Sequence, residues 1–268
     1  MAKVAIITGA SSGLGKATAF LLSKKGYTVY GTCRNPKEYE APQGYVLLPL
    51  DLNDGTSIKG LVSQVMAKEK RIDVLINNAG AGIIGPMEEL DLKALRDNFE
   101  TNCYGPLQLI QHILPQMRLQ KEGFIMNVTS IGAAMGLPFR GAYSASKGAM
   151  SLWTESLRME LKSFGIRICT VAPGDFISNI ASRRYYAPQK KESPYELVYQ
   201  KNLTTIDDHV DSGIAPEVIA QKIASIITKK NPKVHYRVGA PLQKFSVVLK
   251  AILPSRLFEK LLLRFYHI

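Results

Sequence analysis

The sequence has few of the residues that bind metals or form disulfides. Its three cysteines (Cys33, Cys103 and Cys169) lie far apart, and its four histidines are scattered along the chain. No spacing among them indicates a zinc site, and an odd number of cysteines argues against a disulfide framework. We therefore expect no metal centre and a reducing, cytoplasmic environment.

Long apolar segments and acidic residues are also scarce. No uninterrupted apolar run reaches the ~18 residues of a membrane-spanning helix, and the first expected strand starts at residue 3, which leaves no room for a signal peptide. The 34 basic residues outnumber the 22 acidic ones, so the net charge is +12. The basic residues are spread along the chain without a recognition motif, so we expect no nucleic-acid partner. An anionic cofactor or an anionic membrane surface accounts for the charge equally well.

A glycine-rich turn follows the first apolar run. Residues 4–7 (Val-Ala-Ile-Ile) are typical of a buried parallel strand, and they lead into Thr8-Gly-Ala-Ser-Ser-Gly-Leu-Gly15 and then a helical pattern. Glycines let a backbone approach a pyrophosphate, and a helix start supplies free N–H groups. The spacing differs from the usual Gly-x-Gly-x-x-Gly fingerprint, and glycines equally serve tight turns. The position after a first strand favours dinucleotide binding, with contacts from Gly9, Ser11, Ser12, Gly13, Leu14 and Gly15.

A tyrosine and a lysine lie four residues apart in an expected helix. They are Tyr143 and Lys147, and Ser130 precedes Tyr143 by thirteen residues. Positions i and i+4 share one helix face, so the ammonium lies beside the phenol. At about 4 Å and an effective dielectric of roughly 20, this charge favours the phenolate by about 4 kcal/mol. A solvated helix can carry the same pair without function, but the glycine turn and Ser130 favour a proton-transfer site.

Together these motifs resemble the single-domain short-chain dehydrogenases/reductases. The resemblance covers residues 3 to about 178 and rests on Thr8-Gly-x-x-x-Gly-x-Gly15, Asn77-Asn78-Ala79-Gly80, Asn102, Ser130, Tyr143-x-x-x-Lys147 and Pro173-Gly174, in the family's order. Beyond it, the tail is only broadly similar to the 17β-hydroxysteroid-dehydrogenase-like and retinol-dehydrogenase-like branches. The resemblance implies an oxidoreductase that uses a nicotinamide cofactor.

The order of apolar runs and helical patterns predicts the fold. They alternate as βαβ units require, with no internal repeat and no Pro/Gly/Ser linker. Expected strands cover residues 4–7, 27–33, 44–50, 72–76, 124–128 and 166–171, and expected helices cover 58–67, 91–103, 105–119 and 143–163. We predict an α/β fold: a single Rossmann-like, doubly wound domain at 1–240, with a mostly parallel seven-stranded sheet and helices on both faces. A helical extension of the same domain follows at 241–268.

The resemblance implies a role for each catalytic residue. Ser130 bonds the substrate oxygen at the carboxyl end of its strand, and Tyr143 moves the proton. Lys147 assists Tyr143 and holds the nicotinamide ribose. Asn102 breaks its helix locally, and its main-chain carbonyl holds a water linked to Lys147; from the sequence alone it is only a polar residue in a helix. The turn that supports the nicotinamide is Pro173-Gly174-Asp-Phe-Ile-Ser178, where Phe176 and Ser178 replace the family's Val/Ile and Thr.

The end of the second strand predicts which cofactor binds. NAD-preferring enzymes place an acid there for the ribose 2′-OH, but no acid occurs between residues 27 and 37. Arg34 can meet the 2′-phosphate of NADP instead, so we expect NADP(H) rather than NAD(H), unless Arg34 is simply exposed at a helix start. The resemblance places Asp51 and Leu52 at the adenine, although Asp51 or Asn53 could instead cap a helix. It places Asn78, Ala79 and Gly80 beside the adenine-side ribose.

Two further segments bear on the substrate. Residues 175–213 form a long polar insert with several tyrosines and basic residues, which is typical of a substrate lid but also of ordinary surface. In the last 25 residues, Phe245, Val248, Leu249 and Ile252 have helical spacing, Pro254 ends that helix, and a second starts near Leu257. Basic residues prevail at 244–268. That extension could contact an anionic membrane surface, close the substrate pocket or pack on another subunit.

The sequence therefore predicts an enzyme that transfers hydride between NADP(H) and a secondary alcohol or ketone. The expected substrate is an apolar small molecule, such as a steroid, a retinoid or a 3-keto lipid. A reductase of small carbonyls or 3-oxoacyl groups is the alternative within this class. A catalytically silent NADP-sensing or scaffold protein is the alternative outside it, against which the intact Tyr143 and Lys147 argue. We also expect a homo-oligomer, either a dimer or a tetramer.

Overall fold

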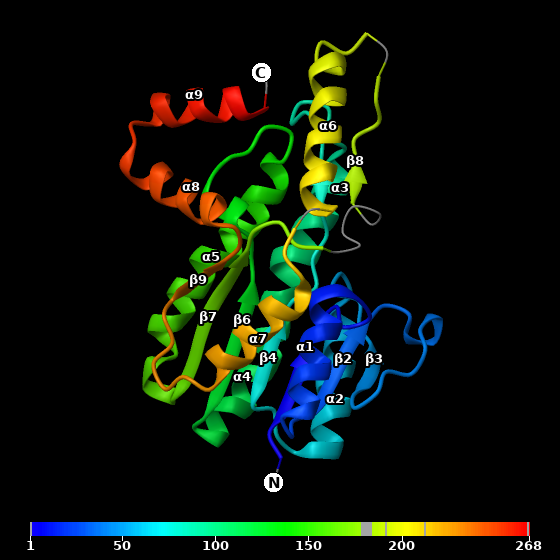
Figure 1. The fold of residues 1–268 in the computed structure, drawn as a ribbon. Coiled ribbons are helices and arrows are strands. Elements are labelled where there is room, and N and C mark those ends of the chain that lie inside the picture. Colours follow the sequence, from blue (N-terminus) through cyan, green and yellow to red (C-terminus); the bar gives the residue numbers. More distant parts are fainter. Residues whose placement is uncertain (1, 178–183, 191, 212, 267) are drawn as a thin grey trace.

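The fold is built on a seven-stranded sheet whose strand pairs are all parallel. A computed structural model describes residues 2–177, 184–190, 192–211, 213–266 and 268 (Figure 1). The strand order is β3-β2-β1-β4-β6-β7-β9. Their bounds are β1 Val4–Ile7, β2 Thr28–Cys33, β3 Val46–Pro49, β4 Val74–Asn77, β6 Gly123–Val128, β7 Ile166–Pro173 and β9 His235–Val238. The predicted α/β doubly wound class is confirmed.

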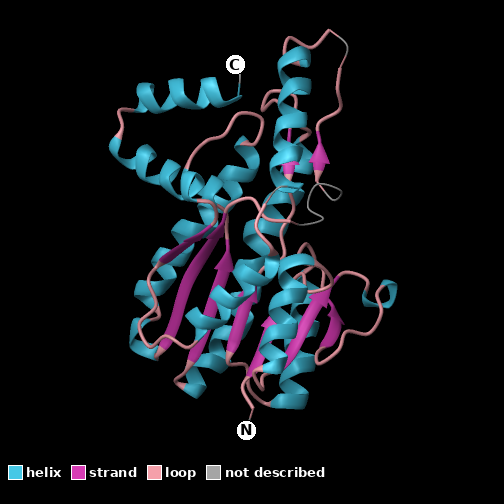
Figure 2. Cartoon of the chain, in the orientation of Figure 1, coloured by secondary structure: helices cyan, strands magenta, loops and turns pink. Residues whose placement is uncertain are grey.

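Helices cover both faces of the sheet (Figure 2). The alternation of side chains along a strand decides which face each residue serves. Ala5 and Ile7 of β1 pack with helices α1 (Gly13–Lys24) and α7 (Pro216–Ile227). Val4 and Ile6 pack on the opposite face with α2 (Gly55–Glu69) and α4 (Gly105–Gln120). Because both faces are covered, the strands read as continuous apolar runs in the sequence.

Helix α5 packs along β7, on the face that α2 and α4 cover, and most other elements gather at the carboxyl ends of the strands (Figure 1). A small parallel sheet pairs β5 with β8, and helices α6, α8 and α9 stand above the main sheet. Their bounds are β5 Ile83–Ile84, α3 Leu92–Phe99, α5 Gly141–Glu160, β8 Tyr185–Tyr186, α6 Glu196–Asp211, α8 Pro241–Ile252 and α9 Ser255–Tyr266. Short 3-10 turns occur at Pro36–Glu38, Ile131–Ala134 and Lys162–Phe164. No helix in the described ranges combines the length and the apolar character needed to cross a membrane.

Several elements differ from the sequence-based prediction. The helix expected at 91–103 is α3 followed by a π-helical turn at Glu100–Tyr104. The insert at 175–213, whose periodicity was too weak to indicate a helix, contains α6. The cap of α2 is neither Asp51 nor Asn53 but Asp54, whose carboxylate accepts the Thr56 N–H at 2.8 Å. The cap therefore lies one residue after Asn53, whereas the helix itself begins at Gly55, three residues before the expected start at residue 58.

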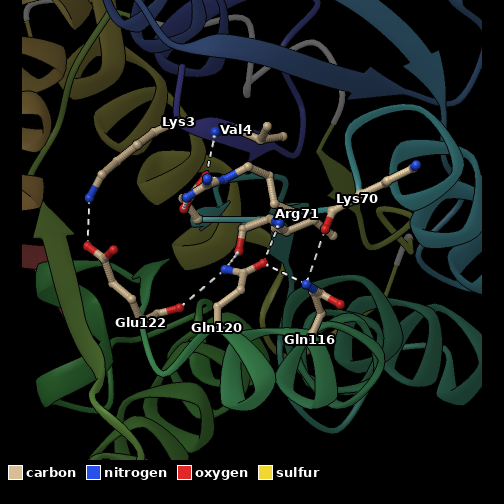
Figure 3. A network of polar contacts seen from close by, with 9 residues as sticks. Lys3, Val4, Lys70, Arg71, Gln116, Gln120 and Glu122 are labelled. Atoms are coloured by element: carbon tan, nitrogen blue, oxygen red, sulfur yellow. Dashed lines mark hydrogen bonds and ion pairs between the residues drawn. The ribbon is translucent and has the colours of Figure 1, made fainter. Parts of the chain in front are cut away.

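Polar contacts tie the sheet together at the end opposite to the elements above it (Figure 3). The buried Asp73 carboxylate, just before β4, accepts the Val4 N–H at 2.7 Å and a two-pronged contact from Arg71. Gln120 bonds both backbone groups of Ile72 and so joins the end of α4 to the same point. Burial raises the pKa of Asp73, but the bonds from Arg71 and Val4 outweigh this and hold the pKa below its ordinary value.

Asp73→Asn is expected to lower the free energy of unfolding by about 2–4 kcal/mol, because it leaves the Arg71 guanidinium without its buried partner. The native pKa of Asp73 is lowered from 3.8, so the carboxylate stabilises the fold at neutral pH and loses this effect as the pH falls through the native pKa. Urea denaturation should therefore show a large difference in the free energy of unfolding between the wild type and Asp73→Asn at neutral pH. This difference should become smaller in acid. Asp97→Asn, in an exposed pair with Lys93, is the control and should change nothing measurable.

Candidate active site

The glycine turn is fixed to the end of the neighbouring strand by one threonine and one asparagine. The Thr8 hydroxyl accepts the N–H groups of Asn78 and Ala79, both at 2.9 Å. In return, the Asn78 amide donates to the carbonyls of Thr8 and Gly9. These contacts bring β1 and β4 together at their carboxyl ends. Asn78 and Ala79 therefore brace the turn through contacts that the structure shows directly.

The turn has the shape that a phosphate needs. Gly9 has φ +68°, and a Cβ on Gly15 would lie 2.1 Å from the Gly9 carbonyl oxygen, so neither position accepts a side chain. Ser12 is the N-cap of α1 but makes no side-chain capping bond, and no acid lies in the first turn of α1. The Ser12 side chain therefore leaves the first N–H groups of this helix uncapped. A helix start that binds an anion requires such uncapped N–H groups. The residues present fit the pyrophosphate of a dinucleotide.

The second and third strands end where the adenosine of such a cofactor would lie. Arg34 directly follows β2 and is exposed, and no hydrogen bond or ion pair holds its guanidinium within the described residues. Asp51 follows β3 and accepts the Asn53 N–H, while Leu52 is buried against α4. The exposed Asp51 and Arg34 thus lie at adjacent strand ends, since β2 pairs with β3. Both side chains are accessible for the predicted contacts, Asp51 with the adenine and Arg34 with the 2′-phosphate.

Ser130, Tyr143 and Lys147 meet at the carboxyl end of β6. Ser130 comes two residues after β6, and its hydroxyl accepts the Gly132 N–H at 3.1 Å. Tyr143 lies in the first turn of α5 and lines the same cavity as Ser130. Lys147 lies one turn further, and its ammonium donates to the Val128 carbonyl at 3.0 Å. The three side chains predicted from the sequence are therefore assembled around one point.

The ammonium of Lys147 is almost completely enclosed. The residue is 5% exposed, and burial lowers the pKa of its amine to about 8, an effect that the nearby Cys103 partly opposes. Burial raises the pKa of Cys103 to about 11, so that thiol stays neutral. Lys147 is therefore still mainly protonated at neutral pH. A lysine holding one carbonyl has further N–H donors for a ribose hydroxyl.

A buried amide network holds the π-helical turn against α5. Asn102 lies in this turn and is 1% exposed; its side chain accepts the Ala81 N–H and donates to the Ala81 carbonyl. Its amide also reaches Asn98 and Ser146, and the Ser146 hydroxyl contacts the Tyr143 carbonyl at 2.9 Å. The network thus reaches the helical turn between Tyr143 and Lys147. Whether the Asn102 main chain holds a water stays a prediction.

A small open cavity lies beside these residues. Its wall includes the nicotinamide turn predicted from the sequence, with Pro173, Gly174 and Phe176, and it carries three charged side chains. Ser178, predicted in the same turn, lies outside the described residues. The full lining comprises Gly82, Ile83, Ile84, Thr129, Ser130, Arg140, Tyr143, Pro173, Gly174, Asp175, Phe176 and Arg184.

The C-terminal helices contact two residues that line this cavity. Gln243 of α8 donates to the Asp175 carboxylate at 2.5 Å. Tyr266 of α9 is 4% exposed, and burial raises the pKa of its phenol although a hydrogen bond with Arg140 acts in the other direction. Both contacts end on residues that line the cavity. Of the three roles that the sequence left open for 244–268, these contacts favour the one at the substrate pocket, because they support two residues of its wall.

Some supporting residues escaped the sequence-based prediction. They include Thr8, Tyr45, Asn98, Ser146, Gln243 and Tyr266. Tyr45 bonds the Ala10 carbonyl of the glycine turn at 2.8 Å from a strand thirty-five residues away. Thr8 and Ser146 adjoin motif residues, so their position was a usable signal. Gln243 and Tyr266 reach the cavity wall only through the path of the C-terminal chain, and no local motif marks either residue.

Comparisons with known proteins agree with this geometry. The family model for short chain dehydrogenases matches residues 3–187. A 3-ketodihydrosphingosine reductase of Bacteroides thetaiotaomicron is 35% identical over 99% of this chain and 98% of its own. An NADPH-dependent 3-dehydrocapnine reductase of Ornithobacterium rhinotracheale is 27% identical over 97% and 95%. The crystal structure of a Burkholderia cenocepacia short chain dehydrogenase in complex with NADP is 25% identical, covers 97% of each chain and has a TM-score of 0.77. The predicted resemblance is confirmed: the protein belongs to the short-chain dehydrogenase family and is an oxidoreductase.

Proposed function

We propose that this protein reduces the keto group of a long-chain lipid with NADPH. The observation that carries the proposal is the cavity in which Ser130 and Tyr143 face apolar side chains next to a charged wall. The two relatives described above are named as reductases of 3-ketodihydrosphingosine and 3-dehydrocapnine, which supports a keto lipid over a small carbonyl.

The cofactor is NADP(H), which supplies the hydride when it is bound. The glycine turn and the start of α1 fit its pyrophosphate, and the exposed Arg34 fits the 2′-phosphate through a charge-assisted bond. Asp51 and Leu52 contact the adenine, and Gly80 adjoins the adenine-side ribose. Lys147 holds the nicotinamide ribose with the N–H groups that Val128 leaves free. Pro173, Gly174 and Phe176 support the nicotinamide face.

The proton comes from Tyr143. As charge develops on the substrate oxygen, the Ser130 hydroxyl donates a hydrogen bond to it, and the Tyr143 phenol transfers its proton to it. The enclosed Lys147 ammonium stabilises the phenolate that remains, because two opposite charges attract more strongly where little water screens them. The Asn102 network keeps α5 in place while this happens.

The walls of the cavity indicate which end of the substrate lies where. Tyr143 packs against a cluster of buried apolar residues in which β5, β8 and α6 take part, and this cluster suits a hydrocarbon chain. Arg140, Asp175 and Arg184 lie on the wall and suit a polar headgroup. A ketone between these two regions would lie beside Ser130. This matches a lipid whose keto group is near its headgroup.

Ketone reduction followed at the nicotinamide absorbance tests the proposal. The purified protein with NADPH should reduce a long-chain 3-keto lipid with a larger kcat/KM than its short-chain analogue, because the chain adds buried apolar contacts. The same series with NADH is the matched control for the cofactor. Equal values for long and short ketones would instead indicate a small-carbonyl reductase, and no turnover of any ketone or alcohol would indicate a silent binding protein.

Arg34→Asp is expected to shift the cofactor preference from NADPH toward NADH. The substitution removes the charge that meets the 2′-phosphate and supplies an acceptor for a ribose 2′-OH. Steady-state kcat/KM values for the two cofactors should reverse in order. Lys37→Asp, at another exposed basic residue nearby, is the control and should leave the order unchanged. A preference for NADPH that survives in Arg34→Asp would mean that other residues read the 2′-phosphate.

Self-association belongs to the same proposal. The outward side of α4 and α5 exposes large apolar side chains, among them Leu119, Leu152 and Met159. The rings of Tyr104, just before α4, and Trp153 of α5 pack in a tilted arrangement with centroids 5.7 Å apart. Burial of such side chains between two copies would favour a homodimer or a tetramer.

A further inference from the structure

Helix α9 has two apolar ridges, one largely buried and the other exposed. The inner ridge consists of Phe258, Leu262 and Tyr266, which contact the segments around the active-site cavity. The outer ridge lies one residue earlier in each turn and stays exposed: Leu257 is 47%, Leu261 40% and Phe265 49% exposed, and Ile268 continues it beyond the helix. A single uncovered apolar side chain is common on a surface, but an aligned row of them is not.

A row of basic residues runs beside the outer ridge. This basic ridge consists of Arg256, Lys260 and Arg264, which have i, i+4, i+8 spacing and are all exposed. Each basic residue directly precedes a residue of the outer ridge in the sequence, so the two ridges are neighbours on one side of α9. Helix α8 extends this surface with the exposed side chains of Leu242, Lys244, Phe245, Val248 and Ile252.

The charge of this surface argues against a second copy of the chain as its partner. Residues 241–268 contain five lysines and arginines but a single acid, Glu259. In a two-fold dimer the same surface would meet itself, so each basic ridge would face another basic ridge. The attraction between the apolar rows would then be opposed by like charges. An anionic partner would instead be attracted by the basic ridge.

We propose that the outer surface of α8 and α9 docks on an anionic lipid membrane, with α9 lying in the plane of the interface. The outer ridge would enter the boundary between headgroups and acyl chains, and the basic ridge would lie at the level of the anionic headgroups. An amphipathic helix of this composition binds through both contributions together. Neither contribution requires a change in the inner ridge or in the active site.

Docking at this surface would bring the membrane next to the substrate cavity. The same helix that presents the outer ridge contacts Arg140 through Tyr266, and α8 contacts Asp175 through Gln243. Both target residues line the cavity. One layer of helix therefore separates the cavity from the proposed membrane surface. This consequence rests on the proposed function, because only a lipid substrate would gain from it, whereas the docking itself does not.

Sedimentation with lipid vesicles tests the docking without any assay of activity. The full chain should sediment with vesicles of phosphatidylcholine and phosphatidylglycerol, should bind poorly to pure phosphatidylcholine, and should dissociate as salt is added. The triple variant Arg256→Glu, Lys260→Glu, Arg264→Glu should bind the anionic vesicles at least about a hundredfold more weakly, since each basic residue contributes about fivefold. Leu257→Gln, Leu261→Gln, Phe265→Gln should also lose binding while its charge is unchanged.

A matched control separates a specific surface from the overall positive charge. The variant Lys59→Glu, Lys222→Glu, Lys229→Glu changes the net charge equally at exposed positions on α2, on α7 and just after it, and it should bind like the wild type. Equal losses in the two charge variants would overturn the proposal, as would the absence of binding to anionic vesicles. Concentration-dependent dimers that the apolar variant abolishes would overturn it in favour of a second copy. All variants should still turn over a water-soluble ketone. This result would show that the fold and the proposed function do not depend on docking.

Discussion

Tyr143→Phe is expected to lower kcat for ketone reduction by about three orders of magnitude, the middle of the range for loss of a general acid. The substitution removes one oxygen and leaves the ring that packs beside the cavity. No hydrogen bond within the described residues depends on that oxygen, so the free energy of unfolding should stay close to that of the wild type. The Kd for NADPH should also stay near the wild-type value, because Lys147 and the glycine turn are unchanged.

The measurement pairs steady-state kinetics with a titration of NADPH by protein fluorescence. Tyr195→Phe is the matched control. Tyr195 lies in the insert, and its hydroxyl donates to Glu88 at 2.6 Å, away from Ser130 and Tyr143. Removal of this hydroxyl should leave kcat unchanged. Turnover that survives in Tyr143→Phe would remove Tyr143 from the proton-transfer role. A loss of both turnover and NADPH binding would instead indicate that the phenol holds the cofactor.

Lys147→Met is expected to abolish turnover and, at the same time, to stabilise the protein without cofactor. Burial lowers the pKa of Lys147 from 10.5 to about 8, so the folded state encloses a charge at a cost on the order of 3 kcal/mol. Methionine has nearly the same shape and removes that cost, although it leaves the Val128 carbonyl unpaired, which costs about 1 kcal/mol. The free energy of unfolding should therefore rise by about 1–2 kcal/mol at neutral pH.

The stabilisation that we expect from Lys147→Met depends on pH. Below the native pKa of about 8 both the folded and the unfolded protein hold the proton, so the wild type bears the full cost. As the pH rises toward 10.5 the folded protein releases its proton first, and the advantage of Lys147→Met should disappear. Denaturant unfolding at neutral and at alkaline pH measures both limits, with the exposed Lys222→Met as the control. A variant that is less stable than the wild type at neutral pH would contradict the enclosed-charge account.

The positions of the candidate catalytic residues could be predicted from the sequence because these residues lie at fixed local spacings. Tyr143 and Lys147 are one helical turn apart, and the glycine turn is continuous in the chain, so their geometry follows from the secondary structure alone. The mostly parallel, doubly wound sheet followed from the βαβ alternation in the same way. The position of Ser130 could be predicted because parallel strands end at a common edge of the sheet. These are the parts of the site in which local rules determine the position of a side chain.

The remaining features depend on contacts between distant segments. The Asn98–Asn102–Ser146 network joins a π-helical turn to α5, and nothing in the local pattern distinguishes a π-helical turn from an α-helical one. Helix α9 shows the same limit. The sequence predicted a second helix from near Leu257 but not how its apolar residues divide, with Leu262 packed inward and Leu257, Leu261 and Phe265 exposed. Periodicity identifies apolar positions, whereas packing decides which of them are covered.

Transfer of deuterium from labelled NADPH tests the central claim most directly. The protein is incubated with a long-chain 3-keto lipid and NADPH deuterated on the transferred position of the nicotinamide, and the product is analysed by mass spectrometry. If Ser130, Tyr143 and Lys147 support hydride transfer to the keto carbon, the product is the 3-hydroxy lipid with a single deuterium on the carbinol carbon, and Tyr143→Phe yields almost none. A hydroxy lipid without deuterium, or an unchanged ketone with the wild-type protein, would contradict the account.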